Sequence, residues 1–500
     1  MRSPGGPEWC RPGLSPGVIG TALDAGSRVV LCKFVCRPLS FCGVTGMGSN
    51  PRFSGVRGDC KVHRPCRRTA GDARADGYAG VMEEDEMAQF KPFEMEGMPI
   101  EEQPMNWKDM VPAPYDKKAV DAYTRTRVIL MNGIENNAVL MSHAIERMHP
   151  DPGVKKSMAL MRRIDSQQQE TVNWLNPADQ SIIETTLGYE QVAVDLTANL
   201  AQNEPDPYVK QTLDFALLED FDHLYRYSCL YDYIEGGDPD SIVQGRTEVK
   251  PGRPTSIEHR HPYDSMRKHY DRDTADIKTK MNYITITAGE QQTMLYYRAH
   301  GFMYPDEIAR QLYAEIAEIE EQHVTQYGLL GDPNETMLEK MAMIELNEAY
   351  LYYSFAEQES DPRIKGIWEN FMKMEVTHFN ECARLIKQYE GRDIQDIVKA
   401  DVIEPLVVFE ENKDYVNSVI DAQLDIAPNN MEYVRMRDLP DDWASFGYQR
   451  VMNAKGVPSE EVVGKAGPTL AERDQMQNIR KVKQEMARRV EKGMAAVPAR

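Results

Sequence analysis

Acidic residues and histidines recur in this chain at a spacing that suits metal binding. A Glu-x-x-His motif places two side chains on one face of a helix, one turn apart, so both can reach the same ion. Two such motifs lie 55 residues apart, and each follows another glutamate by 30 residues. One glutamate from each of two helices, with Glu-x-x-His from each of two others, is the ligand pattern of two-metal sites in helical bundles. The set consists of Glu290, Glu320, His323, Glu345, Glu375 and His378.

The residues around these carboxylates are largely apolar. Trp368, Phe371 and Met372, for example, lie within two turns of Glu375 on the same helix face. Burying one uncompensated carboxylate costs several kcal/mol, so four buried together require cations. Two divalent ions would neutralise them, and carboxylate and imidazole ligands suit iron, with manganese as the alternative. We therefore expect two iron ions.

Two further Glu-x-x-His motifs occur, at Glu146/His149 and Glu258/His261. The first ends at a proline and the second lies in a segment without helical period. We interpret both as exposed polar residues.

The elements that position these residues are predicted to be helices. From residue 116 onward, apolar residues recur at three-to-four spacing, with breaks at prolines such as Pro150, Pro177 and Pro207. This pattern predicts four helices between about 118 and 232 and four more up to about 390. A Gly/Pro/Asp-rich linker separates the two sets. Residues 391–500 contain shorter apolar segments and a charged helix near 470–495.

The two sets of helices are copies of one unit. Met148-His149-Pro150-Asp151 returns as Met303-Tyr304-Pro305-Asp306, 155 residues later, and other landmarks keep this offset without a gap. The predicted fold is therefore all-α, with two tandem four-helix bundles. The expected domains are a disordered or non-native extension (1–81), a first bundle (117–232), a linker (233–262), a second bundle with the metal site (263–390) and a C-terminal extension (391–500).

The first copy holds a weaker version of the ligand set. Gln168 replaces one histidine and is a poor iron ligand. Arg162 lies one turn before Asp165, where its guanidinium could neutralise carboxylates in place of a metal. We expect a degenerate site, metal-free or weakly binding, from Glu135, Asp165, Gln168, Glu190, Asp220 and His223.

Residues 283–385 resemble the rubrerythrin branch of the ferritin-like di-iron superfamily. The resemblance implies that Glu348, one turn beyond Glu345, is a further metal ligand. It also implies ferritin-like bundles. Two features depart from the family: no Cys-x-x-Cys pair is present for a rubredoxin-type iron centre, and the connection between the second and third helices, residues 328–334, is short. About seven residues at ~3.3–3.6 Å each barely allow the long crossover of this superfamily.

Composition excludes some partners. The net charge of −21 repels phosphate backbones, so we expect no nucleic acid, and no apolar run is long enough for a membrane span. Six of the eight cysteines lie within the first 66 residues, so the rest of the chain has only Cys229 and Cys382. So few cysteines indicate a reduced, cytoplasmic protein without a disulfide framework. The sequence is compatible with a homo-oligomer.

The expected activity is that of a non-haem di-iron oxidoreductase that reduces peroxide or dioxygen with an unidentified electron donor. A di-iron oxygenase acting on an organic substrate and an iron-storage protein are the alternatives. Tyr297, Tyr327 and Tyr352 lie one or two turns from ligands, either as core aromatics or as hydrogen-bonding or redox partners of the site.

Overall fold

The computed structural model describes residues 89–496, which form a predominantly helical protein within one compact unit. The extension expected at residues 1–81 lies outside the described residues. Eight long helices carry the ligand candidates: α1 (Ala122–Met148), α2 (Pro152–Asn173), α3 (Ile182–Asn203), α4 (Pro207–Glu235), α6 (Ile277–His300), α7 (Glu307–Gly328), α8 (Met337–Gln358) and α9 (Pro362–Glu390).

Local sequence sets the ends of these helices. Each of the eight begins after an Asp, Ser or Thr whose side chain accepts a hydrogen bond from a backbone N–H of the first turn. In α2, α4 and α9 a proline follows the cap, where its missing N–H costs nothing. The bounds of α2, α3 and α4 recur in α7, α8 and α9 exactly 155 residues later. The repeat predicted from sequence is therefore also a repeat of helices.

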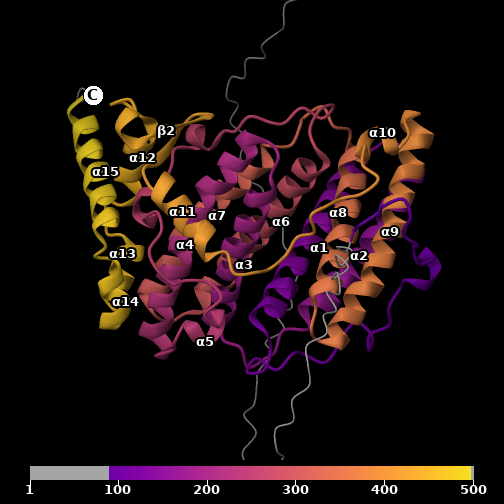
Figure 1. Cartoon of the computed structure of the whole chain (residues 1–500), viewed down its shortest axis with the longest axis horizontal. Helices are drawn as coiled ribbons and strands as arrows, with labels where there is room; N and C mark the ends of the chain where they lie inside the picture. The colour runs from indigo at the N-terminus through magenta and orange to yellow at the C-terminus, as the bar shows by residue number, and fades with distance from the viewer. Residues whose placement is uncertain (1–88, 497–500) are drawn as a thin grey trace, which may run out of the picture. The chain divides into compact units, whose positions relative to one another are not determined.

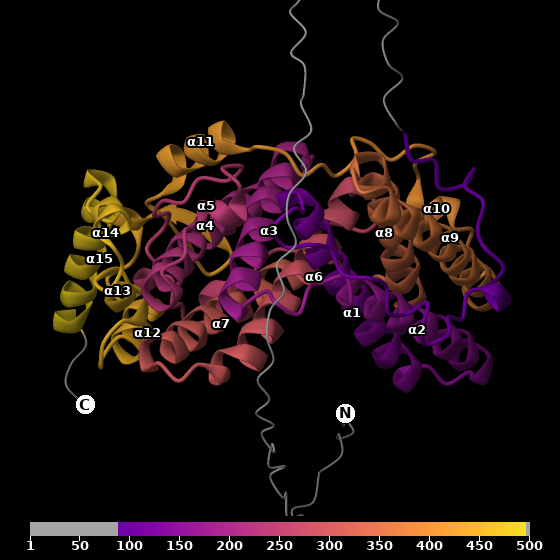
Figure 2. The same ribbon diagram turned by 90° about the horizontal axis from the view of Figure 1, so that it is seen from below.

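The helices pair as four hairpins, α1–α2, α3–α4, α6–α7 and α8–α9. Hairpin α1–α2 packs with α8–α9, whereas α3–α4 packs with α6–α7 (Figures 1 and 2). Each group of four thus combines a hairpin from the first copy with one from the second. The prediction of bundles made from residues 117–232 and 263–390 alone does not describe this packing.

Connection length explains this exchange. Eight residues, 329–336, join α7 to α8 and span at most about 28 Å when extended. A helix of 22 residues is about 33 Å long, so these residues cannot return along α7 to start a parallel neighbour. The chain instead enters the adjacent group. The long connection, residues 236–276, joins α4 to α6 within one group and contains α5 (Asp240–Val243) and two 3-10 turns, Thr255–Ile257 and Pro262–Ser265.

The two groups meet through α1, α3, α6 and α8, which lie at the middle of the unit (Figure 2). Gln292 of α6 donates to the carbonyl of Ile129 in α1 at 2.7 Å and accepts from Asn132 at 3.0 Å. A Cβ at Gly133 would collide with the Gln292 side chain, so glycine is required at this close approach.

The segment after α9 packs on α4 and α7. The Tyr225 hydroxyl donates to the carbonyl of Leu470 at 2.7 Å, and Arg226 donates to that of Ser459 at 3.0 Å. A two-stranded antiparallel hairpin pairs Ile426 with Arg435, and the charged helix expected near 470–495 is α15. The elements of this segment after α9 are α10 (Gln395–Val398), α11 (Lys413–Gln423), β1 (Ile426–Asn429), β2 (Glu432–Arg435), α12 (Ala444–Met452), α13 (Pro458–Val463), α14 (Pro468–Arg473) and α15 (Gln477–Ala496). Within residues 89–496, no helix has the length and apolar character to cross a membrane.

Candidate metal centres

One cluster of acids and histidines lies inside the group of α3, α4, α6 and α7, and we call it the α4/α7 cluster. Each of α3 and α6 gives one glutamate, and each of α4 and α7 gives an acid and a histidine three residues apart. All six side chains are at most 2% exposed. The side chains form two sets, and within each set the possible ligand atoms lie close enough together to hold one ion. Glu320 belongs to both sets. The members are Glu190, Asp220, His223, Glu290, Glu320 and His323.

The two histidines of this cluster point one ring nitrogen at the carboxylates. His323 Nδ1 lies 3.2 Å from Asp220 and 3.3 Å from Glu320. His223 Nδ1 lies 3.0 Å from Glu320 Oε1. Glu320 thus stands between the two imidazoles, where a carboxylate can bridge two ions.

The opposite ring nitrogens are held by buried carboxylates outside the cluster. His323 Nε2 donates to Glu219 at 2.8 Å, and His223 Nε2 donates to Glu258 at 3.0 Å. Burial raises the pKa of Glu219, but Arg260 and then His323 and Arg253 bring it below the ordinary value. Such partners fix the ring orientation and leave Nδ1 free to bind a metal.

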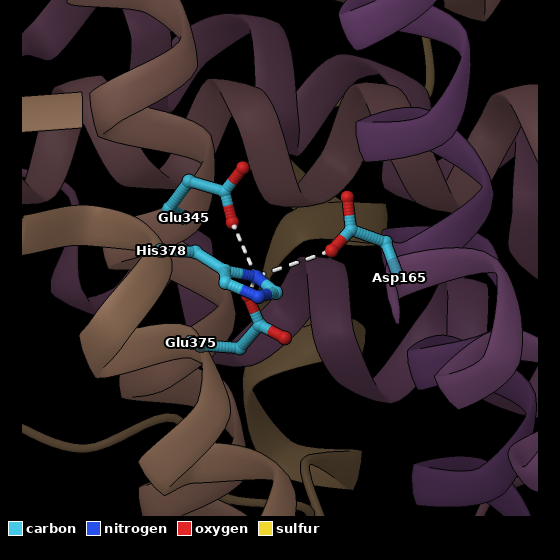
Figure 3. Close-up of side chains that lie close together, drawn as sticks. All are labelled: Asp165, Glu345, Glu375 and His378. Carbon is cyan, nitrogen blue, oxygen red and sulfur yellow. Dashed lines mark hydrogen bonds and ion pairs between the residues drawn. The ribbon is translucent and has the colours of Figure 1, made fainter. Parts of the chain in front are cut away.

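A second cluster, the α2/α9 cluster, lies in the group of α1, α2, α8 and α9. His378 Nδ1 is 3.1 Å from Asp165, 3.4 Å from Glu345 and 3.1 Å from Glu375 (Figure 3). Asp165 comes from the first copy and the other three from the second. Burial and repulsion from Glu375 help to raise the pKa of both Glu135 and Glu348, and Gln168 lowers the pKa of Glu375. The members are Glu135, Asp165, Gln168, Glu345, Glu348, Glu375 and His378, all fully buried.

The α2/α9 cluster has a different composition. It holds five carboxylates and one histidine, against four and two in the α4/α7 cluster. The Nε2 of its histidine donates to a neutral amide, Gln103 Oε1, at 2.9 Å, and Gln103 in turn donates to the Met98 carbonyl at 2.8 Å. The two clusters therefore offer different ligand fields to a metal.

The electrostatics of both clusters call for cations. Burial, followed by repulsion from neighbouring acids, raises the pKa of Glu345 and Glu348 well above the ordinary value. Burial lowers the pKa of His323, but Asp220 and the other acids raise it well above normal. Many buried carboxylate oxygens have no hydrogen-bond partner within the described residues, including both of Asp165, Asp220, Glu345 and Glu348. These orphaned oxygens and the buried Nδ1 of His323, which has no hydrogen-bond partner among the described residues, fit divalent metal ions that displace the held protons.

Two tyrosines touch the clusters. The Tyr297 hydroxyl donates to Glu190, and that of Tyr352 donates to Glu135. Tyr327 is buried with its ring centroid 6.3 Å from that of His323. Of the alternatives left open for these residues, hydrogen bonding to a ligand thus applies to Tyr297 and Tyr352.

The structure corrects the grouping of the ligands predicted from sequence. The expected single site is divided: Glu290, Glu320 and His323 join the α4/α7 cluster, and Glu345, Glu348, Glu375 and His378 join the α2/α9 cluster. The expected degenerate site is divided too, with Glu135, Asp165 and Gln168 in the α2/α9 cluster and Glu190, Asp220 and His223 in the α4/α7 cluster. The physical reason is the exchange of hairpins between the two groups.

Three individual interpretations also change. Arg162 does not neutralise Asp165, because it pairs with Glu146 and both side chains are partly exposed. Glu258 is fully buried against His223, although its linker position indicated exposure. Sequence reasoning also missed Gln103 and Glu219, because neither lies at a recognisable spacing from the histidine that it binds. The short connection before α8 was the one signal that pointed to exchanged hairpins.

Comparisons of the chain with protein-family models, with curated proteins and with solved structures found no match. Its described part is a helical protein with two buried acid–histidine clusters, each built from four helices of both copies. Such clusters can hold metal ions.

Proposed function

We propose that the chain is a non-haem di-iron oxidoreductase with ferritin-like bundles, which reduces peroxide or dioxygen. One observation carries this proposal: the α4/α7 cluster unites Glu190, Glu290, Asp220-x-x-His223 and Glu320-x-x-His323 in one buried site. This is the two-metal ligand pattern of ferritin-like bundles, with Asp220 in place of one glutamate. Manganese is the alternative metal for the same ligands.

The connections also support ferritin-like bundles. The long segment 236–276 between α4 and α6 supplies the crossover that this superfamily has between its second and third helices. In the other group, the whole α3–α7 region stands between α2 and α8. The short connection of residues 328–334 therefore does not argue against ferritin-like bundles, because it does not have to form the crossover.

The bound iron pair would supply two electrons to an O–O bond. The residues of the chain would hold it in place, exclude water and provide protons. His223 and His323, oriented by Glu258 and Glu219, would bind through Nδ1. The Tyr297 hydroxyl keeps a proton at the edge of the cluster, on the oxygen that faces Glu190. Complete burial of the ligands keeps bulk water away from reactive species.

The α2/α9 cluster would be a second, unequal centre. Glu348 adds a carboxylate, and Gln168 stands where the ligand pattern has a histidine. This site therefore favours metals that prefer oxygen ligands. We expect it to bind metal without matching the redox behaviour of the α4/α7 cluster.

Metal analysis of purified variants tests the proposal. His223→Ala with His323→Ala should remove the metal of the α4/α7 cluster only, and His378→Ala that of the α2/α9 cluster only. His269→Ala, at a half-exposed histidine outside both clusters, is the control. The iron-loaded protein, reduced with dithionite and then separated from the excess, should consume peroxide and regain its visible absorption. Unchanged metal content in all three variants, or no peroxide consumption, would overturn the proposal.

A further inference from the structure

A cleft of about 580 Å³ opens where α1, α2, α3 and α6 meet. Three of its lining residues are close neighbours in sequence of cluster acids. Asn136 follows Glu135, Tyr189 precedes Glu190, and Gln292 lies two residues after Glu290. The cleft is therefore lined by helices that also carry residues of both clusters.

The chemistry of the cleft suits an uncharged, hydrogen-bonding aromatic ligand. Asn and Gln side chains make up seven of its lining residues, and no Lys or Arg lines it. Its one acid, Glu170, already accepts from Trp174 Nε1 at 3.1 Å. The rings of Tyr189 and Tyr296 stack at 4.5 Å between centroids and offer an aromatic surface.

His300 completes the cleft as a proton acceptor. Its ring stacks on Tyr296 at 4.1 Å, and its Nδ1 donates to the Tyr296 carbonyl at 2.8 Å. In a neutral ring this hydrogen bond selects the Nδ1–H tautomer, whose lone pair lies on Nε2. A hydroxyl bound in the cleft could lose its proton to that atom.

Aromatic rings link the cleft to the α4/α7 cluster. Tyr296 lies 6.1 Å from Tyr297 between centroids, and the Tyr297 hydroxyl donates to Glu190. The α2/α9 cluster has no such link among the described aromatic pairs. Its Tyr352, which donates to Glu135, contacts only the buried rings of Trp368 and Phe371. Within residues 89–496, the chain of rings from a cluster to the cleft thus belongs to the α4/α7 cluster.

We propose that the cleft binds a phenolic reductant and that Tyr296 and Tyr297 carry its electron to the α4/α7 cluster. This inference rests on the proposed function. Each of two phenols breaks its O–H bond, gives one proton to His300 Nε2 and thence to water, and gives one electron to the rings. Hydrogen peroxide takes up the two electrons and two protons as its O–O bond breaks. The products are two phenoxyl radicals and two waters.

Binding to the metal-free protein is tested first, with hydroquinone as the probe in calorimetric titration. Ala299→Trp should abolish binding, because the exposed Ala299 lines the cleft. Arg298→Trp, at the neighbouring exposed position outside the cleft, should bind as the unaltered protein does. 1,4-Dimethoxybenzene, which lacks the hydroxyls, should not bind. Binding that survives Ala299→Trp would overturn the assignment of the site.

Electron delivery is tested in the iron-loaded protein with peroxide. Tyr296→Phe keeps a ring that cannot be oxidised readily, so hydroquinone should still bind while its oxidation is lost, and Tyr296→Trp should restore it. Tyr389→Phe, at an exposed tyrosine beside His149, is the matched control. Freeze-quench electron paramagnetic resonance without hydroquinone should show a tyrosyl radical that Tyr296→Phe alters. Hydroquinone oxidation by Tyr296→Phe at the rate of the unaltered protein would overturn the proposal that Tyr296 carries the electron. Peroxide consumption by protein that was reduced with dithionite and freed of the excess, but not by protein supplied with hydroquinone, would refute this inference alone, and consumption by neither would refute the proposed function.

Discussion

At the scale of single residues, the histidines act through both ring nitrogens. Each directs Nδ1 at buried carboxylates and anchors Nε2 on a residue outside the cluster, which is Glu219, Glu258 or Gln103. Carboxylate anchors make an imidazole a stronger electron donor than an amide anchor does. The α4/α7 cluster should therefore stabilise the oxidised metal better than the α2/α9 cluster.

Glu219 is the anchor with the highest expected cost of removal. Glu219→Gln leaves the fully buried Arg260 and Arg253 without their counter-charge. Breaking such a buried pair costs ~3–5 kcal/mol, so urea unfolding of the metal-free variant should show a loss of this size. Glu318→Gln, at an exposed ion pair with Arg298, should change the free energy of unfolding by about 1 kcal/mol or less. Equal effects of the two changes would contradict the role given to Glu219.

Gln168 stands in the α2/α9 cluster where the proposed ligand pattern has a second histidine. Gln168→His restores the second histidine of the ligand pattern on α2, so this cluster should hold metal more tightly in competition with a chelator. The measurement uses protein in which His223→Ala and His323→Ala have emptied the other cluster. Gln167→His, one residue away and bonded to Met105, is the control. A gain in both variants would mean that any added histidine suffices.

At the scale of elements, α3 is held to the long linker through a buried acid. Asp195 accepts from Thr247 Oγ1 at 2.7 Å, and burial raises its pKa to about 8. Because an ordinary Asp has a pKa of about 4, the folded protein holds a proton that the unfolded chain releases between these values. This contribution to stability is complete below pH about 4 and is lost as pH rises through about 8.

Asp195→Asn should remove this pH dependence. One proton corresponds to roughly 1.4 kcal/mol per pH unit, so unfolding free energies measured from pH 5 to 8 should fall more steeply in the unaltered protein than in the variant. Asp179→Asn, at an exposed carboxylate, should leave the pH dependence unchanged. Parallel pH profiles for Asp195→Asn and the unaltered protein would show that Asp195 is ionised in the folded state.

At the scale of the whole molecule, the two copies depend on each other. Each of the two clusters takes candidate ligands from both copies, so neither half holds a complete set in the observed packing. Residues 89–262 and 263–496 produced separately should bind little metal, and mixing them should restore it, as measured by iron content after gel filtration. A monomeric 263–496 fragment that binds two irons would show that tandem bundles can form after all.

The local structure of the helices follows from neighbouring residues alone. Capping residues and Asp-Pro pairs set the helix ends, the offset of 155 residues disclosed the duplication, and the spacing of Glu290, Glu320 and His323 identified candidate ligands. Spacing determines which side chains share one helix face, because that depends on 3.6 residues per turn alone.

Only the tertiary structure decided which faces meet. Apolar helix faces from either copy can pack equally well, so hydrophobic pattern does not choose between tandem and exchanged hairpins. The choice depends on how far the connections reach, and the eight residues before α8 are too short for a crossover. The same exchange brings Asp165 to His378 and Asp220 to His323, residues that lie more than one hundred positions apart in the chain.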